Sequence, residues 1–199
     1  MHITILTFDQ YNELDSLIAL GILNRIKKPD WKVSIASPSK HICSMNGVVI
    51  ESTSSLKDVS AADAVLIGSG MKTREIALDN EIMSNLKLDP SKQLIGAQCS
   101  GALILSKLGL LNNIPACTDV TTKPWVVEAG VTVLNQPFYA QNNIATAGGC
   151  LSSMYLAAWV IARLEGLEAA KNAIDYVAPV GEKEEYVART IKNIEPYLF

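Results

Sequence analysis

The chain has 199 residues, of which 49% are hydrophobic and 19% charged, and its formal net charge is −3 at pH 7. This length and composition predict one globular domain over residues 1–199 with a large interior, and they exclude a disordered protein. The charge argues against nucleic acid as a partner, because binding a phosphate backbone requires concentrated Lys and Arg.

Neither a membrane span nor a metal centre is predicted. No apolar run reaches the length of a transmembrane helix, and the first nine residues lack the basic region of a signal peptide. The cysteines form no CxxC pair, and only His2 and His41 offer nitrogen ligands. We therefore expect a cytoplasmic protein without a metal or cofactor, with four free thiols, at Cys43, Cys99, Cys117 and Cys150.

The hydrophobic pattern predicts alternating strands and helices. In chain order these are strand 2–7, helix 14–26, strands 31–37, 48–50 and 64–67, helix 73–86, a strand and helix around Cys99, strands 131–134 and 143–146, and helices 150–164 and 167–177. Strands separated by helix-length segments predict a mostly parallel sheet with helices on both faces. In such sheets reactive groups gather beyond the carboxyl ends of the strands.

The most informative segment is 92–105, which reads as a buried strand, an abrupt turn and a helix, with Cys99 at the turn. Such a strand-to-helix elbow pushes the sulfur out of the sheet and places it near the unpaired N–H groups of the new helix. That environment favours the thiolate, which is the nucleophilic form of cysteine. The alternative is that Cys99 is a small apolar core residue.

A second strand end carries glycines. The apolar run 64–67 leads into Gly68-Ser69-Gly70, and the backbone amides of Gly70 and Ser100 are candidates to hold a developing oxyanion. The alternative is an ordinary turn at the end of a strand. A phosphate-binding loop is disfavoured, because the GxGxxG pattern is not met and no Lys-Ser or Lys-Thr follows.

Several segments carry a family resemblance in the correct order. They are Phe8-Asp9 with Glu13-Leu14-Asp15, residues 63–70, the elbow 97–101, residues 120–125 and residues 143–149. Together they extend from about residue 3 to 166, and they resemble the DJ-1/PfpI superfamily, the single-domain relatives of class I glutamine amidotransferases. Within it the chain is most similar to the branch that contains isonitrile hydratase and the sensor domains of AraC-type regulators.

The resemblance implies an α/β fold, a flavodoxin-like three-layer sandwich with a mostly parallel central sheet, and a homodimer. It places Cys99 on the nucleophile, Asp15 on an acidic position of the first helix, and Gly70 with Ser100 on the oxyanion amides. A protonated Asp15 would hydrogen-bond the thiolate and hold its pKa low. The alternative for Asp15 is a first-turn residue favoured by the helix dipole.

The same resemblance implies that Thr121, Thr122 and Trp125 line the pocket, although core or dimer packing is an alternative for Trp125. Cys150 begins a helix after two glycines, where the dipole favours reactivity, and packing against the sheet is the alternative.

Two positions depart from the family pattern. Peptidase members carry Cys-His at the elbow, whereas Ser100 follows here, which argues against a peptidase. Many members carry a histidine where this chain has Lys123, and lysine is a poor general base at neutral pH. A Cys–His mechanism, including the glyoxalase type, is therefore not expected. Neither His2, which opens a strand, nor His41, in a polar loop, is an obvious substitute.

Two functions follow from these residues. The first is a cysteine-dependent hydratase or hydrolase of a small molecule such as an isonitrile, in which Cys99 attacks carbon and water resolves the adduct. The second is a redox-stress or ligand sensor without turnover, in which an oxidant converts Cys99 to sulfenic or sulfinic acid beside a carboxyl group. Direct control of DNA is not expected, because the sequence shows no C-terminal helix-turn-helix pair after the domain.

Overall fold

The computed structural model describes residues 1–198 and contains a seven-stranded sheet in the order β5-β2-β1-β6-β7-β9-β8. All neighbouring strands are parallel except β8 and β9. The central strands β6 and β7 are buried along their whole length, as continuous apolar runs in a parallel sheet should be. The strands are β1 (His2–Leu6), β2 (Lys32–Ser37), β5 (Ser54–Ser55), β6 (Ala64–Ile67), β7 (Leu94–Gln98), β8 (Phe138–Gln141) and β9 (Ile144–Ala147). A separate hairpin pairs β3 (His41–Cys43) with β4 (Val49–Glu51).

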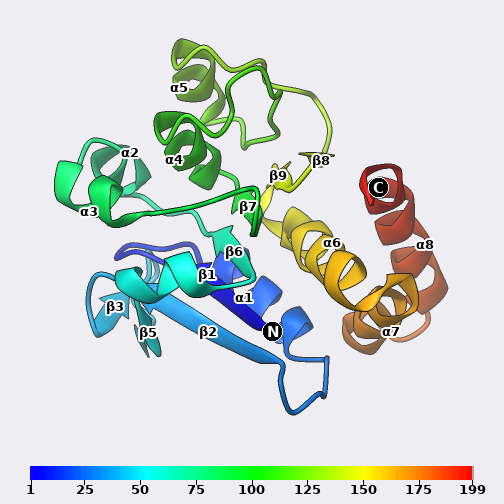
Figure 1. The fold of residues 1–199 in the computed structure, drawn as a ribbon. Coiled ribbons are helices and arrows are strands. Elements are labelled where there is room, and N and C mark those ends of the chain that lie inside the picture. Colours follow the sequence, from blue (N-terminus) through cyan, green and yellow to red (C-terminus); the bar gives the residue numbers. More distant parts are fainter. Residues whose placement is uncertain (199) are drawn as a thin grey trace.

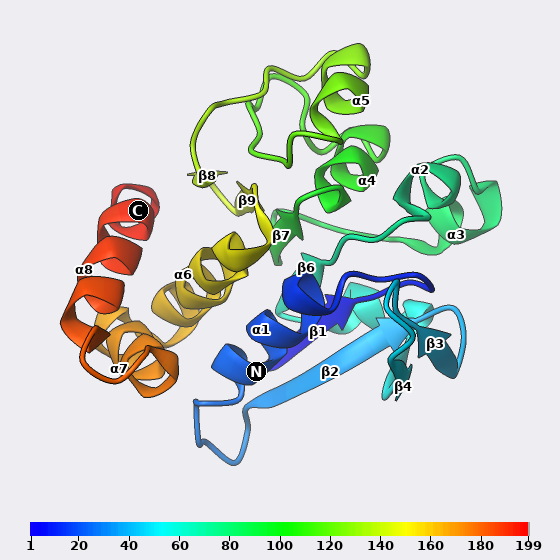
Figure 2. The same ribbon diagram turned by 180° about the vertical axis from the view of Figure 1, so that it is seen from behind.

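Helices cover both faces of this sheet, as Figures 1 and 2 show. One core lies between the sheet and α1, α6, α7 and α8, around the fully buried Trp159. The other lies under α2 to α5 and the short helix η1. The helices are α1 (Glu13–Leu23), η1 (Leu56–Ala61), α2 (Thr73–Ile76), α3 (Asn80–Asn85), α4 (Gly101–Lys107), α5 (Lys123–Glu128), η2 (Cys150–Ser152), α6 (Ser153–Glu165), α7 (Leu167–Val177), α8 (Lys183–Ile194) and η3 (Glu195–Tyr197). The predicted three-layer, flavodoxin-like α/β sandwich is therefore confirmed.

Three local predictions were wrong. The single helix expected over 73–86 is divided into α2 and α3, because the Asp79 side chain accepts hydrogen bonds from the backbone of Glu81 and Ile82 and so starts a new helix. Residues 131–134 form no sheet strand and make only one bridge, between Ala116 and Val133. The edge strand is instead β8, which forms a hairpin with β9. His41 lies in strand β3 rather than in a loop.

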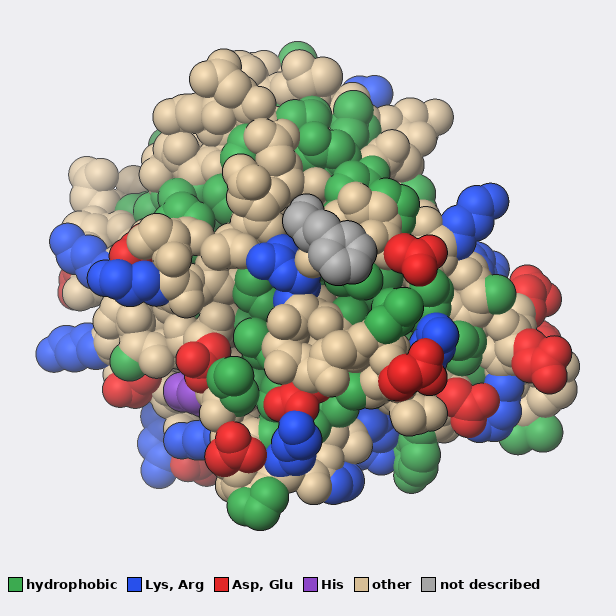
Figure 3. Space-filling model, turned by 45° about the vertical axis from the view of Figure 1, so that its right-hand side comes forward, with side chains coloured by type: hydrophobic (Ala, Val, Ile, Leu, Met, Phe, Trp, Pro, Cys, Tyr) green, Lys and Arg blue, Asp and Glu red, His purple; other side chains and the backbone are tan. Residues whose placement is uncertain are grey.

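The surface carries charges of both signs. Figure 3 shows Lys and Arg side chains interspersed with Asp and Glu on one face, without the continuous basic stripe that a phosphate backbone requires. Within residues 1–198, none of the helices combines the length and the apolar character needed to cross a bilayer.

Candidate active site

Cys99 lies on the strand-to-helix elbow that the sequence predicts. It follows the last residue of β7, its backbone φ is +47°, and its side chain is only 3% exposed. Its N–H donates to the carbonyl of Ala147 at 2.8 Å, and its own carbonyl accepts a hydrogen bond of 2.7 Å from the hydroxyl of Thr118. A positive φ is costly for a residue with a Cβ, so these bonds hold Cys99 in a strained conformation.

Asp15 faces this elbow from the first turn of α1. The helix begins at Glu13 because the Asn12 side chain accepts a hydrogen bond from the backbone of Leu14, which caps the N-terminus. Asp15 is 2% exposed, and its Oδ2 accepts a hydrogen bond from the hydroxyl of Ser69, two residues after the end of β6. The fold therefore buries a carboxyl group next to the predicted nucleophile.

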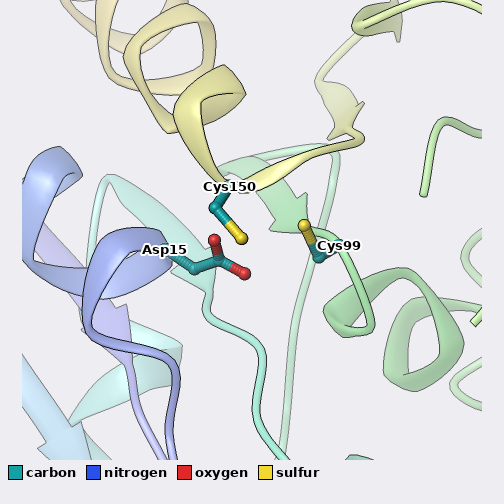
Figure 4. Close-up of side chains that lie close together, drawn as sticks. All are labelled: Asp15, Cys99 and Cys150. Carbon is teal, nitrogen blue, oxygen red and sulfur yellow. The ribbon is translucent and has the colours of Figure 1, made fainter. Parts of the chain in front are cut away.

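A third group completes the cluster. The side-chain sulfurs of Cys99 and Cys150 and a carboxylate oxygen of Asp15 all lie within 4.8 Å of one another. Figure 4 shows the three side chains gathered at one place. Cys150 begins η2, two glycines after the end of β9, which pairs with β7. The structure thus brings together Cys99 and Asp15, and it adds Cys150.

Burial dominates the acid–base properties of the cluster. Burial raises the pKa of Asp15, and it outweighs the hydrogen bond from Ser69, which lowers it. Burial and then the charge of Asp15 raise the pKa of Cys99, and the same two causes raise the pKa of Cys150. The sequence-based expectation of a lowered Cys99 pKa is therefore not met, and burial of the thiol is the main reason.

Side-chain amides contact both sulfurs. Nε2 of Gln98 lies 3.5 Å from the Cys99 sulfur and donates to the carbonyl of Gly149 at 2.8 Å, while Nδ2 of Asn12 donates to the Cys150 sulfur at 3.2 Å. The sequence pattern alone does not assign a role to these amides or to Ser69. The signals were present, since Gln98 adjoins Cys99 and Asn12 is a helix cap three residues before Asp15.

Two acceptors in the cluster have no partner. Among the side chains of residues 1–198, only Asp15 Oδ1 and Gln98 Oε1 are buried polar atoms without a hydrogen bond. A buried acceptor without a partner is costly in a folded protein. Both lie beside Cys99, so the cost is concentrated at the candidate nucleophile.

The predicted oxyanion amides lie next to this cluster, but one is occupied. The Gly70 N–H donates to the hydroxyls of Thr73 at 3.1 Å and Ser100 at 3.3 Å, and these two hydroxyls are 2.7 Å apart. The Gly70 amide can bind an oxyanion only if these hydroxyls move aside. The roles of Gly70 and Ser100 stay predictions.

The predicted pocket residues lie on the segment that leads into α5. Thr122 is buried and its N–H donates to the Asp119 carboxylate at 2.9 Å, whereas Thr121 is exposed. Trp125 is half-buried, with the Arg74 guanidinium 5.0 Å from its ring centre. The segment influences the cluster through Asp119, whose charge raises the pKa of both Asp15 and Cys99. The pocket roles of Thr121, Thr122 and Trp125 stay predictions.

No histidine lies at the cluster. His2 is at the amino end of β1, where its Nε2 lies 2.7 Å from the Ser34 hydroxyl, and the cluster lies beyond the opposite, carboxyl ends of the strands. His41 is in the separate hairpin, and Lys123 is exposed on α5. Two thiols and a carboxyl group are also ligand types for zinc.

Comparisons with known proteins agree with the fold. The model of the DJ-1/PfpI family matches residues 1–163. DJ-1 of Schizosaccharomyces pombe is 15% identical with a TM-score of 0.76, covering 90% of this chain and 100% of that one. Oxidized DJ-1 of Toxoplasma gondii is 20% identical with a TM-score of 0.74, covering 88% and 97%. A ThiJ/PfpI family protein from Pseudomonas syringae is 17% identical with a TM-score of 0.74, covering 98% and 87%. No curated protein gives a significant sequence match.

Proposed function

Because the chain belongs to the DJ-1/PfpI family, we propose that it is a cysteine-dependent hydratase or hydrolase of a small molecule, with Cys99 as the nucleophile. The observation that carries the proposal is the pair of unpartnered buried acceptors, Asp15 Oδ1 and Gln98 Oε1, beside the Cys99 sulfur. Such acceptors suit a site that positions water or accepts a proton during the reaction. An isonitrile is the substrate class we favour, since its terminal carbon is small enough for a deeply buried sulfur.

Asp15 replaces histidine as the proton acceptor in this proposal. A carboxylate whose pKa is raised by burial is a stronger base than an exposed one, and it lies within 4.8 Å of the Cys99 sulfur. As the sulfur bonds to the isonitrile carbon, Asp15 takes the thiol proton and delivers it to that carbon, which forms a thioimidate.

Water then completes the reaction. Its oxygen bonds to the thioimidate carbon while Gln98 Oε1 accepts a hydrogen bond from it, one water proton passes to the imidate nitrogen and the other to the sulfur, and the carbon–sulfur bond breaks. The sulfur leaves as the Cys99 thiol and the product is an N-substituted formamide, so that the net change is addition of one water. The Ser100 amide is our candidate for stabilising the negative charge that develops during this addition.

Formamide production from a panel of isonitriles tests the proposal. We expect Cys99→Ala to abolish turnover and Cys117→Ala, which changes a buried thiol outside the cluster, to retain it. Asp15→Asn should lower kcat by about 10²-fold or more, the usual contribution of a general base. A Cys99→Ala protein as fast as the wild type would exclude this mechanism.

A sensor function is the second candidate, and one observation favours it. The Asp15 carboxyl group is close enough to Cys99 to hydrogen-bond a sulfenic or sulfinic acid formed there. Formamide production separates the two functions, because a sensor has a reactive Cys99 but no turnover. The pH dependence of iodoacetamide labelling tests what both functions require, a reactive thiol at Cys99. A homodimer and a cytoplasmic location stay predictions, and analytical ultracentrifugation would test the first.

A further inference from the structure

Cys150 has no role in the proposed hydration, yet its sulfur lies within 4.8 Å of the Cys99 sulfur. Figure 4 shows the two sulfurs pointing into the same space beside Asp15. A disulfide needs a sulfur–sulfur distance of about 2.05 Å, so the two atoms would have to approach by about 2.7 Å at most. Rotation of two side chains covers such a distance.

The backbone already holds the two cysteines side by side. The Cys99 N–H donates to the Ala147 carbonyl at 2.8 Å, and the Gln98 amide donates to the Gly149 carbonyl at 2.8 Å. These bonds join the elbow after β7 to the turn after β9. Gly149 has φ of +87°, a conformation that favours glycine. The turn it forms places Cys150 next to the elbow.

The two sulfurs differ in their surroundings. Cys150 is partly exposed, whereas Cys99 is 3% exposed. The Asn12 amide donates to the Cys150 sulfur at 3.2 Å, a closer contact than the 3.5 Å between the Gln98 amide and the Cys99 sulfur. A hydrogen bond from an amide favours the thiolate, so Cys150 is the sulfur that is both more accessible and better supported as an anion.

We propose that a peroxide converts Cys150 and Cys99 into a reversible disulfide, with Cys150 as the sulfur that reacts first and Cys99 as the resolving thiol. Asp15 is the nearest base for both thiol protons. The reaction requires only the peroxide as oxidant, and a dithiol reductant restores the starting state.

The chemistry proceeds in two steps. The Cys150 sulfur attacks one peroxide oxygen, the O–O bond breaks, and the second oxygen leaves with the thiol proton as water, which produces a sulfenic acid. The Cys99 sulfur then displaces hydroxide from this sulfenic acid, the S–S bond forms, and the Cys99 proton leaves with the hydroxide as a second water. The two thiols lose two electrons and the peroxide gains two.

The disulfide has two effects on Cys99: it prevents further oxidation of the sulfur and it prevents attack on a substrate. Its sulfur cannot proceed to the irreversible sulfonic acid while it is bonded to Cys150. It also cannot attack a substrate, so oxidation would stop the proposed hydration until a reductant is added. This last consequence rests on the proposed function, whereas formation of the disulfide does not.

Mass spectrometry of the whole chain after treatment with hydrogen peroxide tests the proposal. The protein is treated with a chelator first, so that a bound metal cannot mask the thiols. We expect a loss of two hydrogen atoms, a Cys99–Cys150 cross-linked peptide, and a drop from four to two titratable thiols that dithiothreitol reverses. The control Cys43→Ser should still form the cross-link. Unlinked Cys99 and Cys150 in the treated wild type would overturn the proposal, whether or not the protein hydrates any isonitrile.

Two further variants test the order of the steps. In Cys99→Ser, the sulfenic acid on Cys150 has no resolving thiol, so dimedone should label Cys150 at least tenfold more than in the wild type. In Cys150→Ser, Cys99 should be oxidised at least tenfold more slowly than Cys150 is in the wild type. Equal rates would contradict the assignment of Cys150 as the first sulfur to react. Circular dichroism verifies that both variants are folded.

Discussion

The strain at the elbow can be measured by comparing glycine and alanine at two nearby positions. Cys99 has φ of +47°, whereas Ala97, two residues earlier, lies in the regular strand β7, and both side chains are buried. At position 97, a protein with glycine should be less stable than one with alanine by about 1.5–2 kcal/mol, because glycine adds entropy to the unfolded chain and removes a buried methyl group. At position 99 the same costs apply, but glycine also relieves a left-handed conformation that costs other residues about 1–2 kcal/mol.

We therefore expect Cys99→Gly and Cys99→Ala to have nearly equal free energies of unfolding, while Ala97→Gly loses about 1.5–2 kcal/mol relative to the wild type. The assay is urea unfolding followed by circular dichroism. In thermal melts the loss at position 97 should lower Tm by about 2–4 °C per kcal/mol for a domain of this size. Equal glycine penalties at the two positions would refute the claim that the elbow at Cys99 is strained.

Two further predictions concern the walls of the site. Asp15→Asn should raise the free energy of unfolding at pH 7. Burial raises the pKa of Asp15 above its usual 3.8, so the wild type loses stability as the pH rises from 3.8 through the folded-state pKa. Urea titrations should show this advantage shrinking as the pH falls toward 3.8, and an advantage that grows on acidification would contradict the reasoning. Gly70→Ala should destabilise by about 1–3 kcal/mol, since its Cβ would lie 2.4 Å from the backbone oxygen of Gln10, which cannot rotate away. The matched control is Gly21→Ala in α1, where a Cβ meets nothing within 4 Å. Helix propensity predicts that this variant gains up to about 1 kcal/mol of stability. Equal changes in stability at the two sites would refute the steric argument.

The interior of the sheet was readable from local sequence, but its edge was not. The run 64–67 is apolar throughout, and only a strand buried on both faces accounts for that pattern. The segment 131–134 looks more like a strand than 138–141, yet only the latter pairs with β9. The hairpin depends on the turn at Asn142, whose φ is +56°, and this signal was present in the Asn142-Asn143 dipeptide.

The site was predictable only where local sequence shows the role of a residue. Cys99 and Asp15 lie on elements whose roles are visible locally, an elbow and a first helical turn. Cys150 was weighed only as a residue at a helix start, because no local pattern shows that β9 lies next to β7 and that their ends share one space. The direction of the Cys99 pKa was also out of reach, since burial depends on how α1 and η2 close over the elbow.

Three unfavourable features coincide at this cluster. A cysteine adopts a left-handed backbone conformation, a carboxyl group is buried without a cationic partner within its cluster, and both orphan acceptors found among residues 1–198 belong to the same neighbourhood. Each feature costs stability, and a core selected only for stability would remove them, for example with an alanine at position 99 and an amide at position 15. Their concentration around one sulfur is what a reactive site requires, because the strained elbow places the sulfur beside Asp15 and the buried acid accepts its proton. The position of Cys150 beside the same acid extends this argument from one thiol to two.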